Sequence, residues 1–202
     1  MLDPTSKTSQ VLALLQARGV LRPRDLVELG IHPSNLAHLA RQGLLTRTGR
    51  GLYTLAEGDW TEHHSLVEIA KRIPNCVIGL TTALRFHDLT DEMPFKIWIF
   101  ISQKARAPQV DYPPVNVFRC KVENLYAEVI RPNLEGIEVC VTNVPRTIAD
   151  CFRHRSSVGM DVAIFAMKEA LRRGLCTPAE MASTAKRFRA YNFMRPYLEA
   201  IL

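Results

Sequence analysis

The 202-residue sequence lacks the long hydrophobic runs that membrane proteins need. Its longest apolar runs, such as residues 11–15 and 97–101, are far shorter than the roughly 20 residues that span a bilayer. The first residues, Met1-Leu2-Asp3-Pro4, contain neither a basic leader nor a continuous apolar stretch, so we expect no export. These absences predict a soluble cytoplasmic protein with no membrane partner.

Paired cysteines are also lacking. The five cysteines stand singly, with no Cys-x-x-Cys pair and no histidine at zinc-finger spacing. We therefore expect reduced thiols, no disulfide framework and no metal site. The cysteines are Cys76, Cys120, Cys140, Cys151 and Cys176.

Three common catalytic signatures do not occur. The sequence contains no Gly-x-Gly-x-x-Gly, no P-loop and no Gly-x-Ser-x-Gly, so a dinucleotide enzyme, an NTPase or a serine hydrolase would lack its usual motif. We expect no cofactor and no catalytic residues. The composition is ordinary for a folded protein, with 47% hydrophobic and 23% charged residues.

Positive charge is concentrated at the two ends of the chain. The net charge is +6 overall: residues 1–58 carry +3, residues 59–149 carry −1 and residues 150–202 carry +4. A basic excess raises the rate of encounter with polyanions, but it also serves simple solubility. The motifs must decide between the two.

The first 56 residues show the order of a winged helix-turn-helix. A helix that begins at Thr8 or Ser9 and stops at Gly19 is followed by helices over residues 23–29 and 33–42, joined by a tight corner. Strand patterns at residues 44–48 and 52–55 then flank a Gly-Arg-Gly tip, which predicts a basic hairpin.

The remainder predicts an α/β domain, in an α+β arrangement, with a small sheet covered by helices. We place the domain boundary between residues 58 and 59, giving a DNA-binding domain at 1–58 and a second domain at 59–202. Three strands are expected, at residues 95–101, 115–120 and 137–142. Later helices are expected at residues 146–153, 162–173, 178–189 and 196–202.

The predicted third helix has one apolar face and one polar face. At 100° per residue, Leu36 and Leu39 share the core side, Ser34, His38 and Arg41 point the opposite way, and Asn35 lies on the flank. Arginine can donate two hydrogen bonds to guanine and asparagine can match adenine, so we expect this face to read bases. A solvated surface is the plain alternative.

Four further arginines are candidates for phosphate contacts. Arg47 and Arg50 lie on the hairpin, where the flanking glycines allow close backbone approach to DNA. Arg22 and Arg24 begin the second helix, beside the reading helix. Simple solubility is the alternative role for each of these side chains.

Several motifs in this order resemble the AbiEi family, antitoxins and transcriptional regulators of type IV toxin-antitoxin systems linked to abortive phage infection. No single motif is diagnostic, but their joint spacing covers nearly the whole chain. The motifs are Val20-Leu21-Arg22-Pro23-Arg24-Asp25-Leu26, Leu29-Gly30-Ile31, residues 36–45, Gly49-Arg50-Gly51-Leu52-Tyr53, residues 80–90 and Pro145-Arg146-Thr147-Ile148-Ala149-Asp150.

This resemblance implies a winged helix that binds double-stranded operator DNA upstream of its own operon and represses it. It also implies a C-terminal domain that is needed for antitoxicity. The toxin of such systems is of the nucleotidyltransferase type, and the antitoxin counters it without a stable complex.

Two other classes of function stay open. One is a nucleic-acid-processing enzyme with a nuclease-like C-terminal domain, whose best candidate residues are His87-Asp88 and Asp91-Glu92; we favour helix termination for these residues. The other is a protein-interaction module. Arg146 and Asp150, at i, i+4 spacing, predict a structural ion pair, and the basic cluster at residues 186–189 predicts a solvated helix face.

Overall fold

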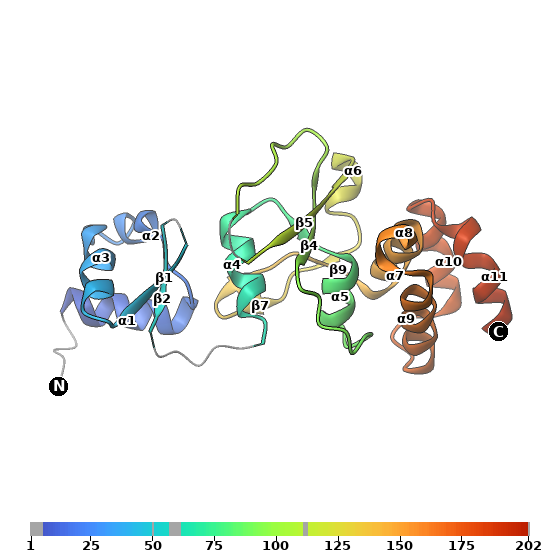
Figure 1. Ribbon diagram of the computed structural model, residues 1–202, viewed down its shortest axis with the longest axis horizontal. Helices are drawn as coiled ribbons and strands as arrows, with labels where there is room; N and C mark the ends of the chain where they lie inside the picture. Colours follow the sequence, from blue (N-terminus) through green and yellow to red (C-terminus); the bar gives the residue numbers. More distant parts are fainter. Residues whose placement is uncertain (1–5, 50, 57–61, 111–112, 202) are drawn as a thin grey trace. The chain divides into compact units, whose positions relative to one another are not determined.

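The protein is seen as a computed structural model that describes residues 6–49, 51–56, 62–110 and 113–201 (Figure 1). The chain divides into two compact units. The first contains residues 1–74, 109–113 and 133–138, and the second contains the rest. The domain boundary predicted between residues 58 and 59 lies outside the described residues and stays a prediction.

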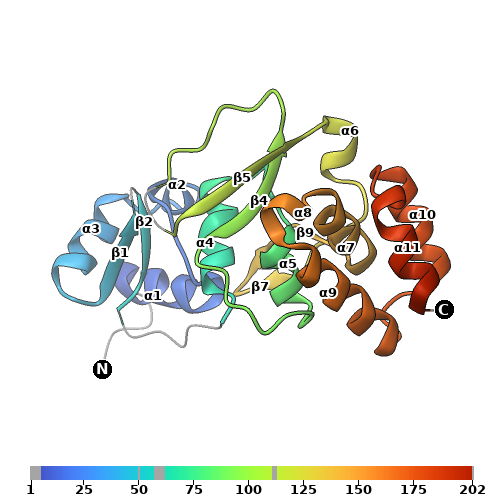
Figure 2. The same cartoon turned by 45° about the vertical axis from the view of Figure 1, so that its right-hand side comes forward.

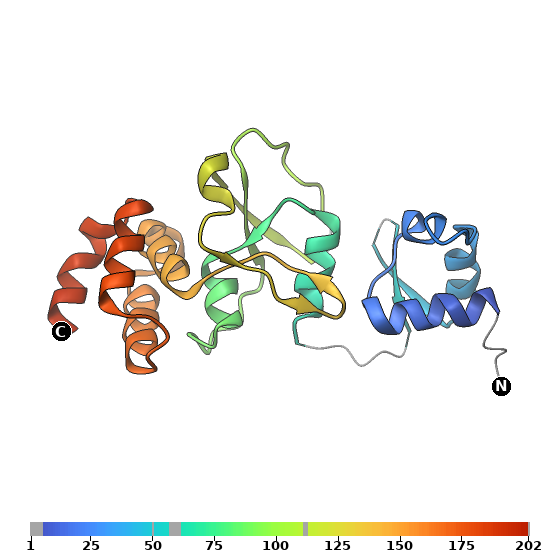
Figure 3. The ribbon, with the colours of Figure 1, turned by 180° about the vertical axis from the view of Figure 1, so that it is seen from behind.

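The first unit begins with three helices and a β-hairpin, shown from behind in Figure 3. Leu21 pairs with Tyr53 of the hairpin, so the strand edge extends into the segment before the second helix. Apolar side chains from all these elements form one core, which includes Leu15, Leu26 and Leu36. The elements are α1 (Lys7–Arg18), α2 (Pro23–Val27), α3 (Ser34–Arg41), β1 (Leu45–Gly49) and β2 (Leu52–Leu55). This is the winged helix-turn-helix order that the sequence predicts.

The start of α1 differs from the prediction. Ser6, rather than Thr8 or Ser9, is the N-cap residue, and its hydroxyl accepts a hydrogen bond from the backbone N–H of Ser9 at 3.1 Å. All three hydroxyl side chains are suitable caps, so composition alone does not select among them. The helix therefore begins one residue before Thr8.

Two glycines set the length of α2 and α3. Gly30 (φ +69°) and Gly43 (φ +73°) occupy the left-handed region just beyond these helices. After each glycine the next N–H reaches back to the helix: Ile31 donates to the Leu26 carbonyl at 2.9 Å, and Leu44 to that of Leu39 at 3.1 Å. The glycines thus determine where α3 begins and ends relative to the core.

The first unit also contains α4 (His64–Arg72) and a small hairpin of β7 (Asn133–Leu134) and β8 (Ile137–Glu138). The His64 ring and the Glu135 carboxylate are 2.7 Å apart. This contact ties α4 to a hairpin that lies some 70 residues later in the sequence.

The second unit is built on a mixed five-stranded sheet of order β5-β4-β3-β9-β6. The longest pair, β4 (Ile97–Ser102) and the edge strand β5 (Val115–Cys120), is parallel and in register from Ile97 opposite Val115 to Ser102 opposite Cys120. The shorter strands are β3 (Val77–Ile78), β6 (Val129–Ile130) and β9 (Val141–Thr142).

Helix α7 is the centre of the helical layer, because it packs against α5, α9, α10 and α11 (Figures 1 and 2). Its buried residues include Ile148 and Phe152. The helices of this unit are α5 (Leu80–Phe86), α6 (Val122–Leu125), α7 (Val144–Arg153), α8 (Arg155–Val158), α9 (Met160–Arg172), α10 (Pro178–Arg187) and α11 (Tyr191–Ile201). A small sheet covered by helices is thus confirmed for this part of the chain.

Two elements predicted for the later part of the chain were wrong. Residues 137–142 are not one strand: Ile137 and Glu138 pair in the β7–β8 hairpin, whereas Val141 and Thr142 join the five-stranded sheet. Alternation of polar and apolar residues shows which face a strand buries, but not which strand it pairs with. The last helix begins at Tyr191 and continues through Pro196, because burial of Met194 and Leu198 offsets the proline's lost hydrogen bond.

Gly43→Ala tests the role of the glycine that ends α3. No heavy atom outside the immediate chain lies within 4 Å of a Cβ placed there, so the cost arises from the positive φ alone. We expect the free energy of unfolding to fall by about 1 kcal/mol. Urea denaturation of the full chain measures this, with Gly43→Asn as the control that tolerates a left-handed backbone. An unchanged or higher stability for Gly43→Ala would contradict the assignment.

Candidate nucleic-acid interface

Helix α3 presents its polar side to solvent. Leu36 and Leu39 are 0% and 1% exposed and anchor the helix in the core, while Ser34, His38 and Arg41 are exposed and Asn35 is half-buried. Because buried and exposed residues alternate with helical spacing, the core leucines determine the direction in which the polar side chains point. The predicted reading face is therefore uncovered within the first unit.

The N-terminal end of α3 is organised by His32, a residue that the sequence analysis did not select. The His32 Nδ1 atom lies 2.7 Å from the Ser34 hydroxyl and accepts the Ser34 N–H at 3.3 Å, and Asn35 donates to the His32 carbonyl at 2.9 Å. The N-cap residue itself is Pro33, whose side chain cannot accept a hydrogen bond, so His32 binds the first helical N–H from one position earlier. The sequence signal that could have identified this role is a histidine two positions before the first helical residue, Ser34.

The C-terminal half of the face is held by local hydrogen bonds. The His38 Nε2 and Gln42 Nε2 atoms lie 3.1 Å apart, one turn from each other. The Arg41 Nε donates weakly to the Ala37 carbonyl at 3.4 Å, which leaves the terminal nitrogens of its guanidinium available. Arg41 is thus the permanent cation on this helix face.

The hairpin carries Arg47 on β1, which packs against α3. Arg47 is exposed, and its Nε donates to the Gly49 carbonyl at 3.2 Å, where a bulge shifts the register. Arg72 of α4 donates to the Thr48 carbonyl at 2.6 Å and so connects α4 to the end of β1. Arg50, the predicted tip residue, lies outside the described residues.

The two arginines at the start of α2 differ in exposure. The Arg24 side chain is 67% exposed and lies 4.0 Å from Asp25, whereas Arg22 is half-buried. Burial is the main cause that lowers the pKa of Arg22, with neighbouring Arg24 as the second cause. Arg24 is therefore better placed for a phosphate contact than Arg22.

Asp25 anchors this corner. Its carboxylate accepts the Arg22 N–H at 2.8 Å and lies 3.2 Å from the Lys71 ammonium, which also contacts the Val20 carbonyl. The Lys71 side chain is 10% exposed, and burial lowers its pKa. Lys71 therefore has a structural role rather than a phosphate-binding one.

The acidic and histidine cluster after α5 ends the helix. The His87 Nε2 atom lies 2.7 Å from the Thr142 carbonyl, and burial lowers the His87 pKa. Asp88 has a left-handed backbone (φ +54°) and is exposed, as are Asp91 and Glu92. Among the described residues, no group of three His, Cys, Asp or Glu side chains could hold a metal ion.

The predicted ion pair between Arg146 and Asp150 is confirmed. The Arg146 Nε lies 3.2 Å from the Asp150 carboxylate, and the two side chains are only 1% and 5% exposed. Arg146 also donates to the Leu125 carbonyl at 3.0 Å and to that of Ala127. The pair ties α7 to the segment around α6.

The first unit thus contains a winged helix-turn-helix domain whose third helix displays an uncovered hydrogen-bonding face. Residues 9–56 match the sequence model of a family described as "Transcriptional regulator, AbiEi antitoxin". The match confirms the resemblance noted from the sequence for residues 9–56. For the later motifs, at residues 80–90 and 145–150, the resemblance stays a prediction.

Comparison with solved structures extends the likeness of fold to both units. The chain is similar to the RV2827C protein from Mycobacterium tuberculosis, with a TM-score of 0.62 and 15% sequence identity. The likeness covers 96% of this chain and 80% of that one. No curated protein matches the sequence. Within the described residues, the helices are too short or too polar to cross a membrane.

The buried carboxyl of Asp150 predicts a pH dependence of stability. Burial raises its pKa from 3.8 to about 6, despite the opposing effect of Arg146. The folded protein therefore holds this proton more tightly than the unfolded chain, and the stabilisation present below pH 3.8 is lost as the pH rises through about 6.

We expect the free energy of unfolding of the native chain to fall by up to about 3 kcal/mol over this range, relative to Asp150→Asn. Urea denaturation at a series of pH values measures the difference. Parallel pH profiles for the two proteins would show that Asp150 does not titrate in this range.

Proposed function

We propose that this protein is a transcriptional repressor that binds the operator of its own operon, and that it also acts as a type IV antitoxin. The observation that carries the DNA-binding part is the uncovered polar face of α3 beside the hairpin, in a domain of AbiEi type. The match of residues 9–56 to this regulator family supports DNA-binding regulation and a toxin-antitoxin role.

In the proposed complex, α3 enters the major groove. Arg41 faces a base edge with its terminal guanidinium nitrogens, and Ser34, Asn35 and His38 lie along the same face. Arg24, Arg47 and Arg50 contact the flanking phosphates, with Arg22 in a supporting place. In this arrangement α3 reads the bases, and the phosphate contacts of the hairpin align the domain on the DNA.

Arg41→Ala tests the base readout. We expect operator affinity to fall by roughly ten- to hundredfold and the preference at one base pair to relax, because a bidentate contact discriminates by about 1–3 kcal/mol. Fluorescence anisotropy with DNA from upstream of the gene, and with shuffled DNA, measures both effects. Lys168→Ala removes one exposed charge from α9 and is the matched control. Equal operator affinity for Arg41→Ala and the control would contradict this docking.

Arg47→Ala and Arg50→Ala test the phosphate contacts. Each should weaken operator and shuffled DNA alike, and each should reduce the slope of log affinity against log salt concentration by about 1. The same titrations at several salt concentrations give the slope. A change confined to the operator would show that these arginines read bases instead.

The antitoxin part of the proposal concerns a nucleotidyltransferase-type toxin encoded beside this gene. Co-expression of the chain should restore growth that such a toxin arrests, whereas affinity purification should recover the two proteins separately. Recovery at a fixed stoichiometry would replace the type IV mechanism with direct sequestration. Failure to restore growth would remove the antitoxin role and leave the repressor role intact.

A further inference from the structure

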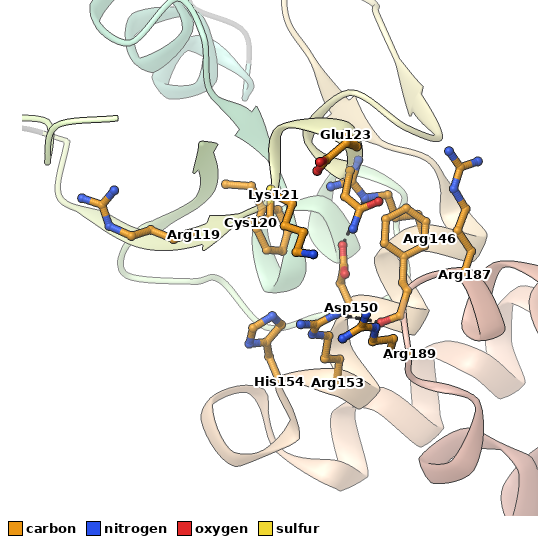
Figure 4. Close-up of a pocket in the computed structure, with 13 residues that line it drawn as sticks. Arg119, Cys120, Lys121, Glu123, Arg146, Asp150, Arg153, His154, Arg187 and Arg189 are labelled. Atoms are coloured by element: carbon orange, nitrogen blue, oxygen red, sulfur yellow. Dashed lines mark hydrogen bonds and ion pairs between the residues drawn. The ribbon is translucent and has the colours of Figure 1, made fainter. Parts of the chain in front are cut away.

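The second unit contains a basic cavity that DNA binding by the first unit does not use. Its volume is about 330 Å³, which is within the range of small-ligand sites, and it is lined by the end of β5, the start of α6, α7 and the end of α10 (Figure 4). Its cationic lining residues are Arg119, Lys121, Arg146, Arg153, Arg187 and Arg189. Two carboxylates, those of Glu123 and Asp150, are also in the lining.

The deepest charges of the cavity neutralise each other. Arg146 pairs with buried Asp150 and packs over the rings of Phe100 and Phe188, with the guanidinium carbon 5.6 and 4.9 Å from the ring centroids. Burial and Arg153 lower the pKa of His154, so this histidine adds no positive charge at neutral pH. The cavity floor is therefore rigid and close to neutral.

The excess positive charge belongs to the rim. Lys121 and Arg189 are exposed, and within the described part of the chain their side chains make no hydrogen bond or ion pair. Arg153 uses one nitrogen to donate to the Phe188 carbonyl at 2.9 Å, which orients its guanidinium. In Figure 4 the side chains of Lys121, Arg153 and Arg189 are directed into the same space, whereas Arg119 extends to one side.

The remaining rim arginines are already engaged. Arg187 lies 3.5 Å from Glu128, and Arg119 donates to the Ala105 carbonyl at 2.6 Å. Of the two carboxylates in the lining, Asp150 is paired with Arg146. The carboxylate of Glu123 is thus the one negative charge of the lining that offsets the three convergent cations. The cavity therefore favours an anion.

Arg189 has an unusual backbone for its position. It lies just after α10 with φ +58°, where glycine or asparagine would be the unstrained choice, and Ala190 donates back to the Ala185 carbonyl at 2.8 Å. Such strain in a cavity wall suggests a functional side chain.

We propose that this cavity binds the phosphate ester of a small molecule of mononucleotide size, held by Lys121, Arg153 and Arg189. Guanidinium and ammonium groups that converge from different elements match the several acceptor oxygens of a phosphate. The concave shape and the small volume suit a terminal phosphate rather than the side of a duplex. The inference is independent of the DNA-binding role of α3.

Isothermal titration calorimetry of the full chain tests the proposal with four probes: ADP, inorganic pyrophosphate, adenosine, and a short single-stranded oligonucleotide with or without a 5′-phosphate. We expect ADP and pyrophosphate to bind and to compete with each other, and adenosine not to bind. Binding of the oligonucleotide only when it carries the 5′-phosphate would identify a strand end as a second source of the same group. Oligonucleotide binding without that dependence, together with no binding of ADP or pyrophosphate, would overturn the proposal.

Two variants connect the binding to the cavity. Arg189→Asn removes the charge but tolerates the left-handed backbone, and Lys121→Gln removes a charge from an exposed side chain. Each should weaken ADP binding at least tenfold, while Lys168→Gln on α9 should bind like the native chain. Thermal unfolding verifies that all three variants fold. Native affinity in both cavity variants would show that the phosphate does not bind here, and operator titrations with the same proteins report the DNA-binding role separately.

Discussion

The DNA-binding proposal depends on one packing constraint, the burial of Leu36 and Leu39 beneath an eight-residue helix. A helix of that length is not stable alone in water, so its existence and its orientation both come from the core of the first unit. The same burial that forms α3 leaves its other face open. Hydrogen bonds that His32 accepts from Ser34 and Asn35 at one end, and the Gly43 turn at the other, limit the helix to this length.

Charge is used differently in the two units. In the first, the described arginines of α2, α3 and the hairpin are spread over an open surface, which suits a long polyanion. In the second, arginines converge on a cavity whose floor is a buried and mutually neutralised ion pair, which suits a compact anion. The net charge of +6 is the sum over both units, so it does not show that the cations are arranged differently in each.

Much of the first unit could be predicted because its signals are local. Glycines at 30 and 43 end helices, Pro23 begins one, and helical spacing separates Leu36 from His38. Helix α10 begins at the predicted residue, Pro178, directly after a capping box formed by Thr177 and Glu180. Where several residues could be the N-cap of a helix, as Ser6 and Thr8 could for α1, the sequence did not select one. The role of His32 was missed because this residue lies outside the helix, one position before the N-cap residue Pro33.

By itself the sequence determined which residues form the winged helix, which face of α3 is polar, and that Arg146 and Asp150 pair, since each follows from spacing along one segment. Only the tertiary structure decided the division of residues 137–142 between two sheets, the passage of α11 through Pro196, and the convergence of Lys121, Arg153 and Arg189 on one cavity. The first and the third of these features join segments that are distant in the chain, and the second depends on the packing of α11 against α7 and α10. Their energies come from burial and charge in three dimensions, which no local pattern records.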